Sequence, residues 1–316
     1  MTIYILIAVL LAISVFCPAL SYARTDDSGS VASVDSSAET SDAEQQDIYE
    51  KCDCVLSRYV DKNGDVDYST LRRKRSDLND AVREIQSISP ITYLSWDDKS
   101  QKAFLINAHN IYTLKLVVDN YPIKPVWYLI NYPADSPKHI DGGRAREKVF
   151  FDMLKHEYTL REIEYDLLLG GFEDETEDEM DILIDRFDDL RVIFALTYAS
   201  ESSAFLRSEA YRPEKLDVQL DDQVRRFLSS DRGMKIDKQE NKVYLSGIFN
   251  WYKKYFLLSD YSKIRKFREH SDHTRAYLNF VVEFASPEDA DYLNNAVFDA
   301  KKSLPYYWAL NDSSGK

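Results

Sequence analysis

The sequence predicts an α+β fold with a single domain, in which several helices pack on a small mixed or antiparallel sheet. Three observations support this class. The 316 residues are 44% hydrophobic and 30% charged, which is a globular composition that can bury a core. Helical and extended apolar patterns follow one another in mixed order, without the regular alternation of a βαβ protein. No internal repeat is visible, and the length fits one domain.

The N-terminus has the pattern of a secretory signal peptide. Residues 3–16 are almost entirely apolar, and Ser-Tyr-Ala at 21–23 supplies a small-residue cleavage site. We therefore expect residues 1–23 to be removed near Ala23, which makes the mature protein secreted or periplasmic. An uncleaved N-terminal membrane anchor is the alternative, because the apolar length is near the lower limit for a span. No later segment is apolar for long enough to cross a bilayer.

Residues 24–45 consist mainly of Ser, Asp, Glu and Ala and contain no aromatic residue. Such a composition cannot bury enough apolar surface to order itself, so we expect a disordered acidic spacer before a domain over 46–316. The chain as a whole has a net charge of −14. This charge gives it no reason to bind nucleic acid, which requires clustered Lys and Arg, and it disfavours anionic membrane surfaces.

Removal of the signal peptide leaves two cysteines, Cys52 and Cys54. A C-x-C pair in an exported protein could close a small strained ring or bond to a second chain. We favour two neighbouring residues of which one packs against the core. The local sequence supplies too few further ligands for a metal site. We therefore expect neither a metal nor a cofactor.

Apolar residues at helical spacing predict a first helix over 46–59, a second over 71–88, and a central buried helix over 99–120. The central helix contains the sequence NAHN. The segment 121–143 is rich in Pro and Tyr, so we expect it to be irregular, and the segment 149–158 has the pattern of a short hairpin.

Between the first two helices, the sequence VDKNGDVDYSTL has acidic and amide residues spaced as in a calcium loop. However, Gly64 comes two positions early, and Arg72 stands where a bidentate Glu is required. The segment therefore predicts an Asn-Gly turn between two short extended segments.

Near the middle of the chain, the spacing of Thr159 and Glu162 predicts a capping box at the start of a helix. The acidic run 170–189 is typical of a solvated loop, because its like charges repel. The apolar run 192–196 predicts a buried strand that leads into a polar loop. Further patterns predict an amphipathic helix, a short strand and the last helix, over 216–228, 243–248 and 276–285 respectively.

Several of these segments resemble, in order, the motifs of the family known as domain of unknown function 547. They are FLINAHNIYTLKLVVDNYP (104–122), YTLREIEYDLL (158–168), RVIFALTYASESSAFLRSEAY (191–211), LDVQLDDQVRRFLSSDRGMKID (216–237), YLSGIFNWYKKYF (244–256) and LPYYWALN (304–311). The resemblance extends over nearly the whole folded chain.

The family pattern places His in I-E-H and I-H-F-A-L, and Cys in N-C-A-S and S-C-P. The resemblance therefore implies either a thiol nucleophile activated by imidazole or a set of metal ligands. This sequence has Tyr165 and Ile193 in place of the two His, and Tyr198 and Ser203 in place of the two Cys. Neither thiol chemistry nor metal ligation can operate at these positions.

We therefore expect a non-catalytic binding or interaction module that keeps the family scaffold, with an unknown small molecule or protein as its partner. The residues expected to bind a ligand are Asn107, Asn110, Glu164, Tyr165, Tyr198, Ser202, Ser203 and Arg207. The alternative is a hydrolase or transferase in which Ser203 is the nucleophile and His109 the base. That alternative requires the Ser203 hydroxyl and a His109 ring nitrogen to come within about 3.2 Å.

Overall fold

The computed structural model describes residues 36–170, 189–300 and 303–314. The chain divides into two units, Met1–Glu39 and Thr40–Lys316, and the architecture below is that of the second. The predicted signal peptide and most of the predicted acidic run lie outside the described residues.

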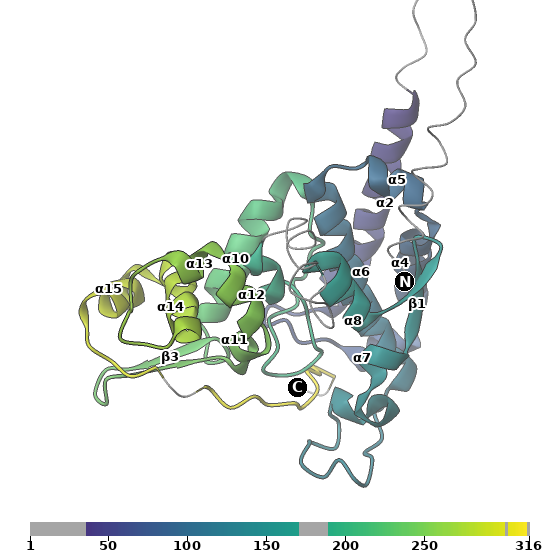
Figure 1. The fold of residues 1–316 in the computed structure, drawn as a ribbon. Helices are drawn as coiled ribbons and strands as arrows, with labels where there is room; N and C mark the ends of the chain where they lie inside the picture. Colours follow the sequence, from purple (N-terminus) through teal and green to yellow (C-terminus); the bar gives the residue numbers. More distant parts are fainter. Residues whose placement is uncertain (1–35, 171–188, 301–302, 315–316) are drawn as a thin grey trace, which may run out of the picture. The chain divides into compact units, whose positions relative to one another are not determined.

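Five helices make up the first part of the described chain. They are α2 (Ser36–Tyr59), α3 (Tyr68–Arg73), α4 (Ser76–Ser87), α5 (Pro90–Ser95) and α6 (Asp98–Asn120). Helix α2 begins within the range for which the sequence predicts a spacer, whereas the predicted helix over 71–88 is two helices that separate at Lys74 and Arg75. Helix α6 contacts α3, α4 and α8 (Figure 1), and it is the central buried helix that the sequence predicts.

The turn between α2 and α3 confirms the prediction of an Asn-Gly turn. Val60 and Val66 form an antiparallel bridge, and the Asp61 carboxylate accepts hydrogen bonds from two backbone N–H groups inside the turn. Gly64 has a φ of 76°, and a Cβ atom there would lie 2.9 Å from the backbone nitrogen of Leu206. This position therefore requires glycine both for its left-handed conformation and for the close approach of a second backbone.

The middle of the chain is composed of short elements. They are η1 (Pro137–Gly143), α7 (Ala145–Lys148), β1 (Phe150–Met153), β2 (His156–Thr159), α8 (Leu160–Glu162) and the π-helical segment η2 (Ile163–Leu168). Strands β1 and β2 form the predicted antiparallel hairpin, with Phe150 opposite Thr159 and Met153 opposite His156. Thr159 and Glu162 form the predicted capping box at the start of α8.

The predicted strand over 192–196 is wrong. The apolar run forms the 3-10 helix η3 (Leu190–Phe194), whose first turn is capped by the Asp189 side chain accepting from the Arg191 backbone N–H. A short apolar run that is buried on all sides suits a strand or a helical turn equally, because periodicity cannot separate the two. The Asp189 cap decides between them, and Phe194 then packs against three phenylalanine rings, Phe227, Phe249 and Phe280.

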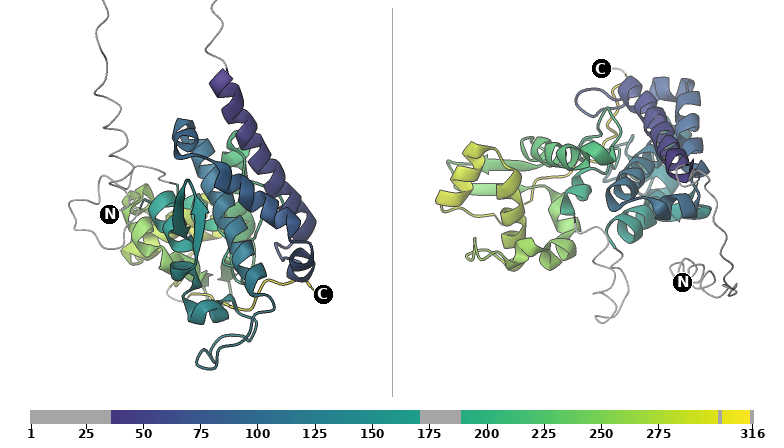
Figure 2. Two further views of the ribbon diagram at one scale, coloured as in Figure 1. Left: turned by 90° about the vertical axis from the view of Figure 1, so that its right-hand side faces the viewer. Right: turned by 90° about the horizontal axis from the view of Figure 1, so that it is seen from above.

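The last part of the described chain is mainly helical. Its elements are η4 (Pro213–Lys215), α10 (Leu216–Leu228), β3 (Met234–Asp237), β4 (Lys242–Leu245), α11 (Gly247–Trp251), α12 (Lys253–Leu258), α13 (Asp260–Lys263), α14 (Asp272–Phe284) and α15 (Pro287–Asn295). The predicted amphipathic helix is α10. It contacts α14, which in turn contacts α12 (Figures 1 and 2).

Two predictions for this part need correction. The predicted strand over 243–248 is β4, which ends at Leu245 because Ser246 caps the start of α11. The predicted last helix is α14, and a further helix, α15, follows it. The Ser286 side chain caps α15 and Pro287 is its first residue, a combination that starts helices.

The fold class is the predicted one. The described residues form a helical domain with two antiparallel two-stranded sheets, β1–β2 and β3–β4. Within these residues, no helix combines the length and the apolar character needed to cross a membrane.

Candidate functional site

Two asparagines on α6 hold the polar segment that follows η3. The Asn107 side chain donates to the Tyr211 carbonyl oxygen at 2.8 Å and accepts from the Tyr211 N–H at 2.9 Å. The Asn110 side chain donates to the Ala195 carbonyl oxygen and accepts from the Thr197 N–H, both at 2.9 Å. Both amides therefore use their donors and acceptors on the backbone of this chain, and they fasten residues 195–211 to α6.

Glu164 is the centre of the buried polar site. Its side chain is fully buried on η2. One carboxylate oxygen, Oε1, accepts hydrogen bonds from the Tyr198 hydroxyl at 2.6 Å and from the Tyr252 hydroxyl. The other oxygen, Oε2, accepts from the Arg146 guanidinium, which also lies 4.2 Å from the centre of the Tyr198 ring. A π-helical turn shifts side chains from the positions of an α-helix, and such turns often occur at functional sites.

Electrostatics keeps Glu164 ionised. Burial raises the pKa of its carboxyl, but the Arg146 charge and the hydrogen bonds together lower the pKa to about 2. Burial raises the pKa of the Tyr198 and Tyr252 hydroxyls well above the usual value, so both stay protonated and act as donors. The site thus holds a paired and hydrogen-bonded charge, which is the condition under which a buried carboxylate is tolerated.

His109 lies beside this carboxylate and is completely buried. Its Nε2 atom is 3.4 Å from the Arg146 guanidinium and 3.7 Å from Glu164, and its Nδ1 atom is 3.4 Å from the Asn110 side-chain oxygen. Because arginine only donates, Nε2 accepts and the proton sits on Nδ1. Burial lowers the pKa of the ring below its usual value, which agrees with a neutral histidine.

The two predicted serines face different partners. The Ser203 hydroxyl is buried and accepts a hydrogen bond from the Tyr198 N–H at 2.8 Å. The Ser202 hydroxyl accepts from the Tyr307 N–H at 2.9 Å, at the edge of a hollow of about 540 Å³ that Tyr307 and Arg232 also line. Each hydroxyl therefore helps to fasten the loop after η3.

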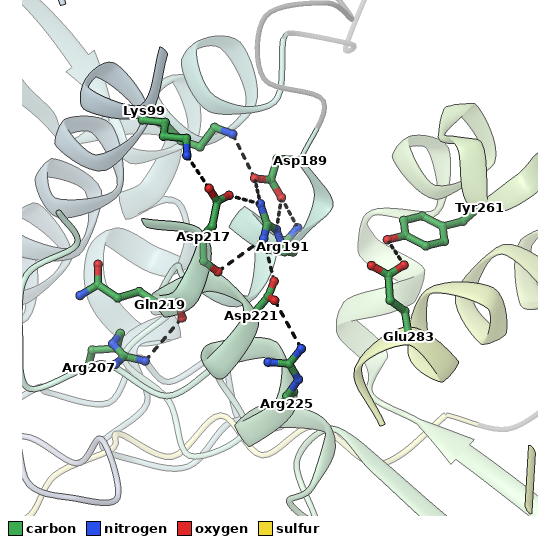
Figure 3. Close-up of polar contacts among 11 residues, drawn as sticks. Lys99, Asp189, Arg191, Arg207, Asp217, Gln219, Asp221, Arg225, Tyr261 and Glu283 are labelled. Atoms are coloured by element: carbon green, nitrogen blue, oxygen red, sulfur yellow. Dashed lines mark hydrogen bonds and ion pairs between the residues drawn. The ribbon is translucent and has the colours of Figure 1, made fainter. Parts of the chain in front are cut away.

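Arg207 belongs to the polar surface around α10. Its guanidinium pairs with Asp222 at 2.5 Å and with Glu209 at 2.7 Å, and it reaches the Gln219 carbonyl oxygen. Figure 3 shows it beside a larger network centred on Arg191.

Arg191 pairs with Asp189, Asp217 and Asp221 at 2.7–2.9 Å. A second hollow of about 540 Å³ lies between this network and the hydrogen-bonded pair Tyr261–Glu283. Lys102 and Arg191 both pair with Asp189 at this hollow, and the Glu283 carboxylate accepts from the Tyr261 hydroxyl.

An aromatic cluster covers the outer side of the Glu164 site. Trp251 packs edge-on against Tyr198 and stacks on Trp308 with ring centres 5.6 Å apart, and Tyr306 contacts both tryptophans. The Lys138 ammonium lies 4.4 Å from the centre of the Trp308 ring. The predicted Tyr165 also belongs here, since it stacks on Tyr252 at 5.8 Å and lies under Arg161.

The structure therefore brings together part of the predicted set: His109, Asn110, Glu164, Tyr165, Tyr198 and, through the Tyr198 backbone, Ser203. Asn107, Ser202 and Arg207 contact Tyr211, Tyr307 and Asp222 instead.

Sequence reasoning missed Arg146 and Lys138, and treated Tyr252 as a packing residue only. Lys138 and Arg146 lie in the short elements η1 and α7, whose sequences have no periodicity to place them. One signal in the sequence could have indicated Arg146. A glutamate that is buried, such as Glu164, requires a cationic partner, and the basic sequence RAREK (144–148) lies upstream of it.

The protonation states of these groups set their reactivity. A carboxylate with a pKa near 2 is a weak base, and the hydroxyls with raised pKa are weak nucleophiles. Among the described residues, no group of three or more His, Cys, Asp and Glu is placed to hold a metal ion. Cys52 and Cys54 are both free, and Cys52 is buried in the core as the favoured interpretation predicts.

The central helix, the loop fastened to it and the buried charge define a class of α+β scaffold with a polar core. The family described as "Protein of unknown function, DUF547" matches residues 93–228, which confirms the resemblance over that range. The matched range contains α6, η2, the segment after η3 and all of α10. Neither a curated protein nor a solved structure gives a significant match to the chain.

Proposed function

We propose that this protein is an exported binding or interaction module and not a catalyst. The observation that carries the proposal is the saturation of Glu164 within the chain. Both of its oxygens are taken by Arg146, Tyr198 and Tyr252. A general base needs a lone pair within reach of the substrate proton, and a buried carboxylate held by three donors does not offer one.

The contacts of Ser203 and His109 also favour binding over hydrolysis. The Ser203 hydroxyl accepts from a backbone N–H, and the His109 ring faces Asn110 and Arg146. A serine nucleophile instead needs a histidine that accepts its proton.

The outer rim of the site supports an anionic ligand. Lys138 and Arg146 lie close enough for the Arg146 charge to lower the pKa of the Lys138 ammonium, in addition to the larger lowering by burial. Trp251, which is 38% exposed, lies at the same rim. An anion beside the Lys138 ammonium would balance its charge, since Arg146 is already paired with Glu164, and the aromatic rings offer apolar contact area. An acidic oligosaccharide has this combination of charge and flat ring faces.

Export is the part of the proposal that rests on residues 1–23 alone. The apolar stretch and the small-residue site at Ala23 support cleavage and release. N-terminal sequencing of the protein from the medium or periplasm of an expressing cell tests it, and a retained Met1 would contradict it.

Catalysis is tested with a broad panel of esterase and peptidase substrates. We expect no turnover by the wild type. Turnover that is lost in both Ser203→Ala and His109→Ala, with each variant still folded by circular dichroism, would overturn the proposal in favour of the hydrolase.

Anion binding is tested by calorimetric titration with an oligogalacturonate as the probe. We expect binding to be lost in Lys138→Met and kept in Lys124→Met, a matched substitution of an exposed lysine outside the rim. Equal binding to a neutral oligosaccharide of the same length, or unchanged binding by Lys138→Met, would contradict the assignment of the rim.

A further inference from the structure

A loop between α6 and η1 exposes three large side chains. Trp127 is 86% exposed, Ile130 is 82% exposed and Tyr128 is 55% exposed. The segment 121–136 projects as a loop close to α7 (Figures 1 and 2). Exposing such residues together costs free energy, and an apolar patch of this kind marks a surface that meets something else.

The loop is held in this shape by hydrogen bonds. The buried His139 accepts from the Val126 N–H at 3.0 Å and donates to the Pro133 carbonyl oxygen at 2.9 Å. Two hydrogen-bonded backbone turns follow. In the first, the Leu129 N–H donates to the Val126 carbonyl oxygen, and in the second, the Tyr132 N–H donates to the Leu129 carbonyl oxygen. The backbone that carries the exposed side chains is therefore held by hydrogen bonds, and these side chains do not pack against the core.

The three exposed side chains also have a fixed arrangement at the tip. The Trp127 ring packs edge-on against the Tyr128 ring at 5.6 Å. The Tyr128 hydroxyl lies against Gly142, where a Cβ atom would come within 2.3 Å of it. Trp and Tyr beside an apolar Ile is the composition that proteins place at the boundary between water and lipid.

Charge decides which surface fits. Residues 121–150 hold five Lys or Arg against three Asp or Glu, whereas the whole chain holds 40 against 54. This region therefore lacks the acidic excess of the chain, although Arg146 is already paired with Glu164. A neutral lipid surface meets no repulsion here, while the remaining acidic chain disfavours anionic lipid.

Size decides between lipid and protein. A stable protein interface buries about 1,200 Å² or more in total, which three side chains on one loop do not supply. A bilayer interface needs only a few apolar side chains, because each one that enters contributes independently.

We propose that the loop 124–132 is a peripheral membrane contact, with Trp127 and Ile130 entering the interfacial zone of a neutral bilayer and Tyr128 at headgroup level. This contact is separate from the anion rim proposed above, and its test does not depend on that rim.

The test uses the full chain and vesicles of phosphatidylcholine, part of which carries brominated acyl chains that quench nearby tryptophan. We expect vesicles to shift the Trp127 emission to the blue and the brominated lipid to quench it. In Trp127→Phe, the quenched component should disappear while vesicle binding remains. This local readout separates the loop from the apolar residues 3–16, which contain no tryptophan.

The double variant W127A/I130S should bind at least about 100-fold more weakly through the loop, because two large apolar side chains no longer enter the bilayer. The control is Val297→Ser, which removes an apolar side chain that is 89% exposed elsewhere on the molecule. All three positions are exposed, so thermal unfolding should be unchanged and should confirm intact folding.

Two outcomes would overturn the proposal. One is vesicle binding without quenching of Trp127. The other is a wild-type dimer in sedimentation that W127A/I130S loses, since a second copy of the chain would then cover the tip.

Discussion

The Glu164 side chain illustrates at the residue scale how one buried charge is maintained. Burial alone would neutralise it, because removing an ion from water costs several kcal/mol. Arg146, Tyr198 and Tyr252 offset this cost with direct hydrogen bonds, and His109 remains neutral next to them. The same contacts connect η2 to α7, to Tyr252 between α11 and α12, and to the loop after η3, so this charge also joins separate elements of the fold.

The stability of the protein should fall in two steps as the pH is lowered. His109 has a lowered pKa in the folded state, so its contribution is present above its unfolded value of 6.5 and is lost below it. Glu164 has its pKa lowered from 4.5 to about 2, so its contribution is lost between these values. The second step amounts to about 3 kcal/mol. Urea unfolding measured across this pH range checks both steps.

The control for the second step is the double variant Glu164→Gln with Arg146→Met, which removes both charges. The loss of stability between pH 4.5 and 2 should shrink in this variant. The single variant Glu164→Gln should cost about 3–5 kcal/mol, because it leaves the Arg146 charge buried without its partner. An unchanged acid profile in the double variant would contradict this account.

At the scale of elements, two glycines offer a matched comparison. Gly64→Ala places a Cβ atom 2.9 Å from the Leu206 backbone at a φ of 76°, whereas at Gly247 nothing lies within 4 Å. We expect Gly64→Ala to destabilise by about 2 kcal/mol or more and Gly247→Ala to stabilise by about 0.4–1 kcal/mol. Thermal unfolding of the two variants measures both changes in stability. Equal changes would contradict the requirement for glycine at position 64.

The clamp between α6 and the loop after η3 is a second element-scale feature. Asn110→Ala removes two buried hydrogen bonds and leaves the Ala195 carbonyl and the Thr197 N–H without that partner. We expect a loss of about 2–4 kcal/mol in urea unfolding. The exposed Asn131→Ala is the control and should be nearly neutral. A loss of less than about 0.5 kcal/mol in Asn110→Ala would contradict the role of the clamp.

Elements with strong local signals could be predicted from the sequence. The helix α6, the β1–β2 hairpin and the capping box at Thr159 are determined by periodicity and capping residues within a short window. The run 192–196 could not be assigned, because its burial on all sides removes the periodicity that separates a strand from a helical turn. The Asp189 cap was the local signal that sequence reasoning did not weigh.

The C-terminal segment holds distant parts of the chain together at the scale of the whole molecule. The Asn311 backbone carbonyl accepts from the Val66 N–H, and its side chain donates to the Gly64 carbonyl oxygen and accepts from the Tyr68 hydroxyl. The Tyr307 and Ala309 carbonyl oxygens also accept hydrogen bonds from the Ser202 and Glu201 N–H groups, respectively. The last residues thus connect the first turn of the domain with the loop of the polar site.

Asn311→Ala should cost about 2–4 kcal/mol, because its loss leaves a buried tyrosine hydroxyl and a backbone carbonyl unsatisfied. Equilibrium unfolding in urea measures the change. Tyr68→Phe is the informative partner variant, since it should recover part of the loss when combined with Asn311→Ala. Strict additivity of the two substitutions would show that the contact contributes nothing.

The site was less predictable than the fold because its residues come from distant segments that only the folded chain brings together. Glu164, His109 and Tyr198 were proposed because they occupy positions in segments that resemble the family motifs, and they do lie together. Arg146 comes from a region without a helical or extended pattern, and only the folded chain shows that it reaches Glu164. Ser202 and Arg207 lie in the same motif but point to other partners, because side-chain direction in an irregular loop does not follow from spacing.

The burial of α6 has a consequence for amide hydrogen exchange. Every residue from Ala103 to Leu114 is buried, and the helix contacts α3, α4, α8, η1, η2 and η4. We therefore expect that partial openings of the domain do not expose these amides to solvent. Their slow exchange with deuterium should therefore report the free energy of global unfolding, and peptides covering α6 should be the last in the chain to gain mass.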